Sequence, residues 1–450
     1  MVELQLSDVQ VNKLTDKDYF GPSGELLLGR GTLVSTHHVE ALKRRGISKL
    51  FIKAETGSDE VKKILESELT LSDLHLGDEP VAKKAQPESN ITDVRFQLEQ
   101  LLSSKSVVKM DQRIETGNFK DSPTGAPLKK ILARKLPSQR SATYKQQLMG
   151  AYNNAMGCVK DQLHRIDCGL EPEASSVRAI TEKFLSTFTQ DSDLLINLAH
   201  SKPSDKNYLI THSMNVSILS IAIATAYGFS EEQVMEIGMG ALLHDIGMVM
   251  IPESIRSKDA RVNSDEWYEI QKHPIFGLHT LEKVKQIPES VLLIAYQVHE
   301  RENGTGYPKQ RTSRLIHNFA RIVQIADIYE ALSSPRQYRK AYPPHKAVEI
   351  LLKMTSQGFI CGRCVKAFLE HIALFPVGSL VELSSGQTGK VIRANGSAYT
   401  KPMVRILFDS RGNPLEEQDQ YEEDLATNTA LRITRALDQS IKPVSLMQGF

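Results

Sequence analysis

The sequence predicts a mainly α-helical protein, in which an all-α bundle is flanked by a small α+β module before it and a small β-rich module after it. From about residue 170 to 375, apolar side chains recur at the spacing of one helix face, as in Val216, Leu219 and Ile223. Capping residues such as Asn263 divide this stretch into separate helices. On both sides of it, short apolar runs lie between glycine turns, which is typical of strands.

Length and composition limit the functions that fit the chain. Its 450 residues exceed what one hydrophobic core usually serves, so we expect several domains. The 55 Lys and Arg residues against 54 Asp and Glu residues give a net charge of +1, which argues against a broad surface for polymeric nucleic acid. The N-terminal residues lack the apolar core of a secretion signal, and the longest apolar stretch, Val216 to Tyr227, is too short to span a bilayer. We therefore expect a cytoplasmic protein with no membrane segment.

The first part of the chain predicts a small module followed by a linker. Residues 1–54 form the expected α+β module, with strands in Gly24–Gly31 and Leu50–Lys53 and a capped helix from Ser35 to Gly46. Nothing in this module resembles an active site. Residues 55–139 are polar, poor in aromatic residues and interrupted by prolines, so we expect a partly disordered linker that holds short helices.

Residues 140–375 form the predicted helical region, and residues 376–450 form the predicted β-rich C-terminal module. The helical pattern first returns from Ser141 to Ile166, where an amphipathic helix can either pair with its copy in a homodimer or pack on its own domain. The C-terminal module contains strand-like runs between glycine turns and no catalytic constellation.

Cys361 and Cys364 have the CxxC spacing of many metal and redox sites. The remaining cysteines are Cys158 and Cys168, so no second CxxC exists to complete a four-thiolate zinc site. We therefore favour packing beside a helix for this pair over a redox or metal function.

The candidate chemistry is centred on the dipeptide His244-Asp245, at the end of an apolar helix. An imidazole beside a carboxylate suits a divalent metal when other segments supply further ligands. A single histidine on an apolar helix is more often a hydrogen-bonded core residue, but a carboxylate at Asp327, inside an apolar run, is costly to bury unless a cation compensates it. Together, residues at helix ends and inner helix faces predict a metal centre: His212, His244, Asp245, His273, His299 and Asp327.

The order of several short motifs resembles the HD-GYP subgroup of HD-domain phosphohydrolases, whose members hydrolyse cyclic di-GMP. The motifs cover roughly residues 175–370. They are His212-Ser213, His244-Asp-Ile-Gly247, Ile251-Pro252, His273-Pro274, His299-Glu-Arg301, Gly304-Thr-Gly-Tyr-Pro308, Arg321-Ile322, Ala326-Asp327 and Arg336-Gln-Tyr-Arg339. The resemblance implies an HD-type helical bundle and a metal-dependent phosphodiesterase of bacterial second-messenger signalling.

The resemblance also implies a site for two divalent metal ions, which in this family are iron or manganese. The implied ligands are His212, His244, Asp245 and Asp327 for the first ion, and the bridging Asp245 with His273 and His299 for the second. In such a site a bridging hydroxide attacks phosphorus while the ions neutralise the growing charge. His244 and Asp245 are therefore the predicted catalytic residues.

Further residues are implied to contact the substrate or a partner protein. Arg336 and Arg339 correspond to positions that hold the nucleotide phosphates, and Tyr307 would help to shape the nucleotide cleft. The loop Gly304-Thr-Gly-Tyr-Pro308 has two interpretations. The first is a rigid turn in which Tyr307 packs, and the second, from the family, adds a contact surface for diguanylate cyclase (GGDEF) proteins at Gly306-Tyr307-Pro308. We place the structural role first.

Several positions depart from the family pattern. Val298 stands where the family has a second histidine before the Glu-Arg pair, and valine cannot coordinate a metal. Met248 replaces a lysine near the phosphate, and Asn303 replaces an acid. Tyr208 stands where some members carry a glutamate for a third metal, so we expect no third ion.

Two alternatives therefore stay open beside a phosphodiesterase that converts cyclic di-GMP to the linear dinucleotide, to GMP or to both. One is a catalytically degenerate HD-GYP domain that serves as a nucleotide-binding or protein-interaction scaffold. The other is an HD phosphohydrolase that acts on another nucleotide. We favour hydrolysis of a cyclic dinucleotide over the degenerate domain, because a dead site has no physical need to keep four imidazoles and two carboxylates together. Another nucleotide substrate stays open, because the shape of the pocket decides the choice of base.

Overall fold

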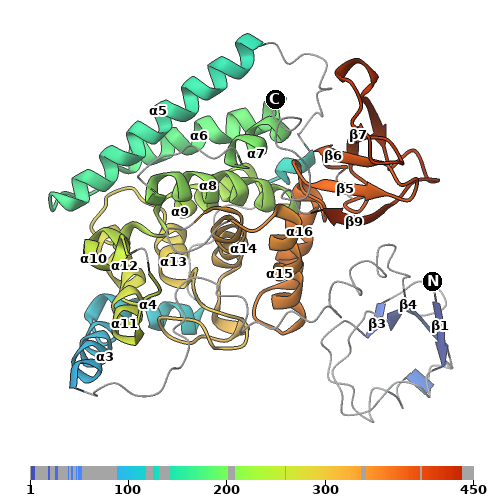
Figure 1. Cartoon of the computed structure of the whole chain (residues 1–450). Helices are drawn as coiled ribbons and strands as arrows, with labels where there is room; N and C mark the ends of the chain where they lie inside the picture. Colours follow the sequence, from blue (N-terminus) through green and yellow to red (C-terminus); the bar gives the residue numbers. More distant parts are fainter. Residues whose placement is uncertain are drawn as a thin grey trace. The chain divides into compact units, whose positions relative to one another are not determined.

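A computed structural model of the whole chain shows two compact units, Met1–Glu66 and Ser67–Phe450 (Figure 1). The structure describes residues 2–5, 19–20, 26–28, 39, 42–43, 47, 49–52, 89–117, 125–130, 142–200, 208–258, 260–335, 341–395 and 398–437.

The N-terminal unit contains a four-stranded antiparallel sheet with the strand order β1-β4-β2-β3. Its strands are β1 (Val2–Gln5), β2 (Tyr19–Phe20), β3 (Leu26–Leu28) and β4 (Lys49–Ile52). Strand β3 lies within the predicted Gly24–Gly31 segment, and β4 overlaps the predicted Leu50–Lys53 segment, beginning one residue earlier. Only Val39, Leu42 and Lys43 of the predicted helix are described, and all three are helical. Leu42 packs with Leu50 in a small core.

The second unit is mainly helical, which confirms the predicted fold class. Its longer helices are α3 (Ser89–Leu102), α4 (Lys105–Thr116), α5 (Ala142–Asp167), α6 (Ala174–Gln190), α7 (Ser192–His200), α8 (Tyr208–Tyr227), α9 (Glu231–Leu243), α12 (His273–Leu281), α13 (Glu289–Gln297), α14 (Asn318–Ser333), α15 (Pro344–Ser356) and α16 (Gly362–Ile372). Shorter helical segments are η2 (Leu128–Lys130), η4 (Ile246–Met250), α10 (Glu253–Arg256), α11 (Ser264–Ile270) and η5 (Ser313–Leu315).

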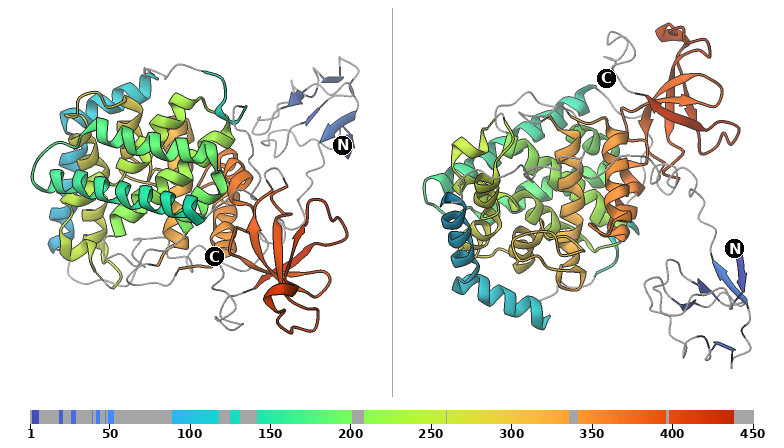
Figure 2. Two further views of the ribbon diagram at one scale, coloured as in Figure 1. Left: turned by 90° about the horizontal axis from the view of Figure 1, so that it is seen from above. Right: turned by 60° about the horizontal axis from the view of Figure 1, so that its bottom comes forward.

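Helix α8 is the centre of this region. It is apolar around its whole circumference and packs against α9, α14 and α16. It is also the one helix, among the described residues, that is long and apolar enough to cross a membrane, and 89% of the relevant window is buried inside the protein. Helices α5 and α6 run along one side of the helical region, against α8 and α9 respectively (Figure 2). A helix buried on all sides can hold a polar side chain away from water.

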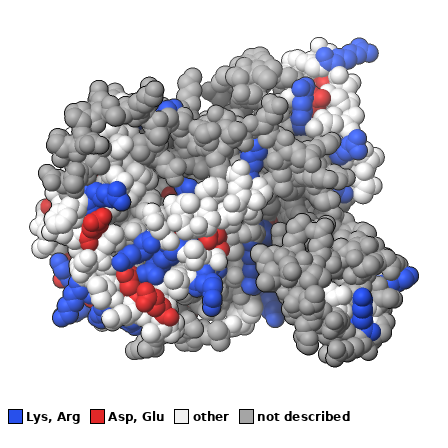
Figure 3. All heavy atoms as spheres, turned by 90° about the horizontal axis from the view of Figure 1, so that it is seen from below, with Lys and Arg blue, Asp and Glu red and all other residues white. Residues whose placement is uncertain are grey.

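Positive and negative side chains are intermixed on the part of the surface that Figure 3 shows. Lys and Arg side chains lie beside Asp and Glu side chains there. Opposite charges form ion pairs, such as the one between Lys258 and Glu266 at 2.6 Å, in keeping with the net charge of +1 for the whole chain.

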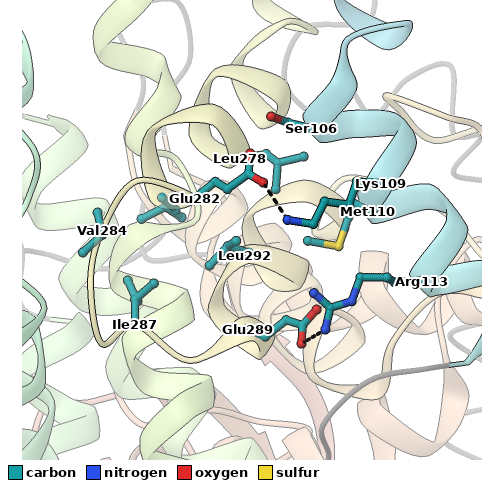
Figure 4. A pocket seen from close by; sticks show the side chains of 11 residues that line it. Ser106, Lys109, Met110, Arg113, Leu278, Glu282, Val284, Ile287, Glu289 and Leu292 are labelled. Atoms are coloured by element: carbon teal, nitrogen blue, oxygen red, sulfur yellow. Dashed lines mark hydrogen bonds and ion pairs between the residues drawn. The ribbon is translucent and has the colours of Figure 1, made fainter.

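Helix α4 lies within the stretch that was predicted as a linker, but it packs on the helical region. Figure 4 shows a pocket of about 180 Å³ where α4 meets α12 and α13. Lys109 of α4 reaches Glu282 at 3.4 Å, and Arg113 forms an ion pair with Glu289. Met110 and the leucines of α12 and α13 form the apolar lining. None of the predicted site residues lines this pocket. The residues that line it connect α4 with α12 and α13.

The C-terminal part of the second unit is a five-stranded antiparallel sheet with the order β8-β7-β6-β5-β9. Its strands are β5 (Leu380–Leu383), β6 (Thr388–Arg393), β7 (Met403–Phe408), β8 (Tyr421–Asp424) and β9 (Ile433–Leu437), with a short helical turn η6 (Glu417–Asp419) before β8. Leu380, Leu407, Phe408 and Leu437 form its core cluster. The sheet lies in the segment predicted to be β-rich.

Candidate metal centre

The six side chains predicted as metal ligands meet inside the helical region. They are His212 in α8, His244 at the C-terminal cap of α9, Asp245 at the start of η4, His273 at the first residue of α12, His299 shortly after α13 and Asp327 in α14. Helices that are distant in sequence therefore create the cluster by packing together.

Asp245 lies at the centre of this cluster. Its Oδ1 atom lies 3.3 Å from His244 Nε2 and 3.4 Å from the Nε2 atoms of both His273 and His299. Its Oδ2 atom lies 3.6 Å from His212 Nε2. The donor atoms form two groups that share Asp245, one with His212 and His244 and one with His273 and His299, and within each group they lie within 4.8 Å of one another. A carboxylate in this position can bridge two cations.

Asp327 closes the cluster from α14. Its Oδ1 atom lies 3.3 Å from His212 Nε2 and 3.9 Å from His244 Nε2. Its Oδ2 atom lies 3.7 Å from His299 Nδ1. The carboxylate inside the apolar run therefore faces imidazoles, which are the neighbours that a shared metal ion would require.

Two of the histidines present a free ring nitrogen to the centre. His244 Nδ1 donates to the Ala241 carbonyl oxygen, and His273 Nδ1 donates to the Ile270 carbonyl oxygen, each at 2.8 Å. Because a carbonyl oxygen only accepts, Nδ1 carries a proton, and in the neutral ring the lone pair is then on Nε2. Both Nε2 atoms are buried and have no hydrogen-bond partner among the described residues. An unsatisfied buried acceptor is costly, so this arrangement fits a cation that accepts the lone pairs.

The ionisable groups of the cluster depend strongly on one another. Burial acts to lower the pKa of His212, but the carboxylates of Glu330 and Asp327 outweigh it and raise the pKa to about 10. Burial acts to raise the pKa of Asp245, but the neighbouring histidines hold it well below the usual range. Burial lowers the pKa of His299 and so favours its neutral, metal-binding form. In the metal-free protein, a proton on His212 therefore offsets part of the carboxylate charge, and a bound cation would take its place.

Gly247 allows the segment after Asp245 to approach α12 closely. A Cβ atom at this position would lie 2.0 Å from the carbonyl oxygen of His273 and 2.6 Å from the backbone nitrogen of Gly277. Both of these are backbone atoms, which cannot move aside as a flexible side chain can. The glycine of the His244-Asp-Ile-Gly247 motif therefore sets the distance between Asp245 and His273.

Glu330 is a site residue that the sequence reasoning missed. Its Oε2 atom lies 2.5 Å from His212 Nδ1, and Tyr208 donates its hydroxyl to the same oxygen at 3.2 Å. Asn215 donates to Oε1 at 3.3 Å. This carboxylate fixes the ring of His212 with Nε2 toward the centre. The available signal was spacing, because Glu330 lies one helical turn after Asp327 on α14.

Tyr307 lies against the second group of ligands. Its ring stacks on the His299 ring, with centroids 4.9 Å apart and an interplanar angle of 11°, and it meets the edge of His273 at 6.0 Å. The Trp267 ring makes a T-shaped contact with the Tyr307 ring, with centroids 5.4 Å apart. Tyr307 is thus in place to pack beside the cluster, as the structural interpretation of its loop predicts.

The loop around Tyr307 is held by backbone contacts. A Cβ atom at Gly306 would lie 2.4 Å from the backbone nitrogen of Arg301, so only glycine fits there. Glu300 is buried and accepts hydrogen bonds from the backbone N–H groups of Lys309 and Arg311, at 2.8 and 2.7 Å. Burial raises the pKa of Glu300 to about 7, despite these bonds. The loop is rigidly attached to the segment that carries His299.

The other predicted site positions have different outcomes. Arg336 and Arg339 lie outside the described residues. Val298 is completely buried, and its backbone carbonyl accepts a hydrogen bond from Gln324 Nε2 at 3.0 Å. Met248 is half-buried. The Asn303 side chain accepts hydrogen bonds from Thr305, so it stabilises the turn of the loop.

Comparison with known proteins assigns the helical region to a family. Residues 193–360 match the family model described as an HD domain. This part of the chain is an HD domain. The six clustered residues lie within it, and the family resemblance seen in the motifs is confirmed. Residues 380–441 match a KOW domain associated with HD domains, which corresponds to the C-terminal sheet.

Curated relatives match between about two fifths and half of the chain. A cyclic di-GMP phosphodiesterase of Pseudomonas aeruginosa is 30% identical over 241 residues, which are 53% of this chain and 57% of that protein. A cyclic di-GMP phosphodiesterase of Borreliella burgdorferi is 27% identical, over 52% of this chain and 61% of that protein. A 3'3'-cGAMP-specific phosphodiesterase of Vibrio cholerae is 30% identical, over 40% of this chain and 34% of that protein. The chain thus covers less than two thirds of each of these relatives.

Proposed function

We propose that this protein is a metal-dependent phosphodiesterase that hydrolyses cyclic di-GMP to the linear dinucleotide, to GMP or to both, in bacterial second-messenger signalling. The observation that carries this proposal is the pair of buried Nε2 atoms, on His244 and His273, which lack a hydrogen-bond partner among the described residues and flank the Asp245 carboxylate. Two relatives that are named as cyclic di-GMP phosphodiesterases support the choice of substrate.

In this proposal the cluster holds two divalent ions, iron or manganese. His212, His244, Asp245 and Asp327 would hold one ion, and Asp245, His273 and His299 would hold the other. The nitrogen and oxygen donors suit these metals better than soft thiophilic ones. When bound, the ions would supply a hydroxide for attack on phosphorus and would neutralise the charge of the transition state.

The residues of the chain itself orient and protect this chemistry. The carbonyl groups of Ala241 and Ile270 fix the rings of His244 and His273. Glu330 fixes His212 from the opposite side. His212, His244 and His273 are buried, and a low dielectric around them strengthens the charge interactions in the site.

Val298 reduces the donor set of the second ion. Asp245, His273 and His299 supply three donors, and the buried Val298 side chain supplies none. Water molecules would complete the coordination shell, so we expect this ion to bind more weakly than the first.

Contacts with the substrate and with partners belong to the same proposal. Arg336 and Arg339 would hold the phosphates, and Tyr307, stacked on His299, would form one wall of the nucleotide cleft. A cytoplasmic location, a homodimer and binding of GGDEF proteins at Gly306-Tyr307-Pro308 are further parts of this proposal.

A second candidate function is hydrolysis of a hybrid cyclic dinucleotide. It is favoured by the relatives from Vibrio cholerae that are named as 3'3'-cGAMP-specific phosphodiesterases, at 30 to 33% identity. The base at the second position would decide between the substrates, because both contain the same phosphodiester linkages.

The test is metal content together with hydrolysis, on full-length protein purified without oxygen and supplied with iron or manganese. We expect about two ions per chain and hydrolysis of cyclic di-GMP faster than of 3'3'-cGAMP. Asp245→Ala should lose both metal and turnover, whereas Arg336→Ala should keep the metal and bind substrate more weakly. Equal metal content in Asp245→Ala and wild type would refute the site. Metal-poor protein that binds the nucleotide intact would instead make it a receptor.

A further inference from the structure

A chain of buried hydrogen bonds connects α5 with the His212 ring of the metal centre. Tyr152 of α5 donates its hydroxyl to Asn215 Oδ1 at 2.9 Å. The Nδ2 group of Asn215 donates to Glu330 Oε1 at 3.3 Å, and Glu330 Oε2 lies 2.5 Å from His212 Nδ1. At most 4% of each of these four residues is exposed. A change at Tyr152 can therefore reach His212 without passing through water.

The contact with Tyr152 decides which end of the Asn215 amide faces Glu330. An amide has an oxygen that only accepts hydrogen bonds and an NH2 group that only donates them. Because Oδ1 accepts the Tyr152 hydroxyl, the NH2 group faces the Glu330 carboxylate and stabilises it. Burial and the charge of Glu330 raise the pKa of the Tyr152 hydroxyl, which therefore keeps its proton and remains a donor. Without this hydroxyl the amide could rotate, and its oxygen would then face the carboxylate and repel it.

Other contacts of Glu330 come from the two helices that its bond with His212 already joins. Tyr208 of α8 donates to Oε2 at 3.2 Å, and Ser334, the residue after α14, donates to Oε1 at 2.6 Å. Tyr152, by contrast, adds a third helix to the network. The orientation of the carboxylate thus depends on α5 as well as on α8 and α14.

Helix α5 precedes residues 193–360, which match the HD family model, and lies at the edge of the helical region (Figure 1). It packs against α6, α8 and η4, the segment that begins directly after Asp245. The buried residues of α5 recur at the spacing of one helix face. They include Tyr152, Ala155, Val159, Gln162 and Ile166. Through this face, α5 contacts the helix that carries His212 and the segment that follows Asp245.

We propose that Tyr152 is a positioning residue of the metal centre, which holds the His212 ring in place for metal binding through Asn215 and Glu330. The ring must present Nε2 to the ion, and a carboxylate on Nδ1 fixes this direction. Because the Tyr152 contact joins two helices, a displacement of α5 relative to α8 would break it and lower the affinity for the first ion. This inference rests on the metal centre of the proposed function, but not on its substrate.

The test measures the manganese affinity of the full chain by competition with a chelator. We expect Tyr152→Phe, which removes only the hydroxyl, to weaken the first binding step about fivefold, the equivalent of one net hydrogen bond, and to leave the second step unchanged. Asn215→Ala should lose at least as much affinity. Tyr296→Phe is the matched control, because its buried hydroxyl donates to Asp111 at 2.9 Å, outside this chain of bonds. A first step that is as tight in Tyr152→Phe as in wild type, or equally weakened in Tyr296→Phe, would overturn the proposal.

A double-mutant cycle separates positioning from a general loss of stability. If Tyr152 acts through Glu330, Tyr152→Phe combined with Glu330→Gln should bind manganese about as tightly as Glu330→Gln alone. Independent contributions would multiply instead. A further loss of about fivefold in the double variant would therefore contradict the assigned role of Tyr152.

The metal-free protein offers a measurement that does not depend on manganese. The proton on His212 Nδ1, in its hydrogen bond with Glu330, should give a downfield resonance in proton NMR, assigned by its absence in His212→Asn. This resonance should move in Tyr152→Phe and stay in place in Tyr296→Phe. Wild-type protein that binds no manganese would refute the proposed metal site, and the resonance would then decide the role of Tyr152 alone. A resonance that is unchanged in Tyr152→Phe would overturn the inference.

Discussion

The close approach at Gly247 makes a sharp prediction about the metal centre. In Gly247→Ala, the new Cβ atom would begin 2.0 Å from the His273 carbonyl oxygen, and real Cβ atoms essentially never approach closer than 3.0 Å. Segment η4 and helix α12 must therefore separate by about 1 Å, whereas functional metal–ligand distances tolerate changes of only about 0.2 Å. We expect the site formed by Asp245, His273 and His299 to lose at least tenfold in metal affinity.

The same substitution should lower the free energy of unfolding by about 1–3 kcal/mol, the usual cost of overpacking, and leave the protein folded. Gly277→Ala is the matched control, because its Cβ atom would lie 3.6 Å or more from every neighbour outside its own turn. This control is also helical, so it should be neutral or slightly stabilising. Metal affinity is measured by competition with a chelator, and stability by urea unfolding. Wild-type affinity in Gly247→Ala, or equal losses in both variants, would refute the reasoning.

Further predictions concern the remaining neighbours of the cluster. Glu330→Gln should weaken manganese binding by about 10–100-fold, because it removes the negative charge that fixes the His212 ring. Competition with a chelator measures the manganese affinity, and Glu289→Gln is the control variant. Nearby carboxylates raise the pKa of His212 to about 10 in the metal-free protein, so His212 must lose one proton when a metal binds at neutral pH. The metal affinity should therefore rise about tenfold for each pH unit from pH 6 to 8, and calorimetry in buffers of different ionisation enthalpy counts the released proton. A metal affinity that does not depend on pH would contradict this assignment. Met248→Lys places a cation at a half-buried position where the family has one, and it should raise kcat in a hydrolysis assay; an unchanged kcat would mean that the lysine is not needed here.

The position of Tyr307 bears on the interpretation of its loop. Stacking on His299 and the backbone contacts of Gly306 and Glu300 give the loop a structural role at the metal centre. A surface for GGDEF proteins remains a prediction for this loop. Such a partner would meet a loop whose conformation is already fixed by its packing on His299.

The sequence by itself was sufficient for the helical fold and for the identity of the clustered residues. Periodicity and caps, such as the capping boxes at Ser230 and Asn263, are local, so they can be read from neighbouring residues. The metal-binding cluster could be predicted because several ordered motifs agree with one family. The polar stretch before residue 139 was predicted to be a linker that holds short helices, and α3 and α4 lie in it; the packing of α4 on α12 and α13 was not predicted.

Only the tertiary structure decided the relations between side chains that are distant in the chain. Glu330 became visible as the partner of His212 because α8 and α14 pack together, although the two residues are 118 positions apart in the chain. Gly247 became essential because α12 lies against its backbone. Spacing in sequence fixes which residues can share a helix face, whereas the approach of one helix to another sets the distances on which binding and reactivity depend.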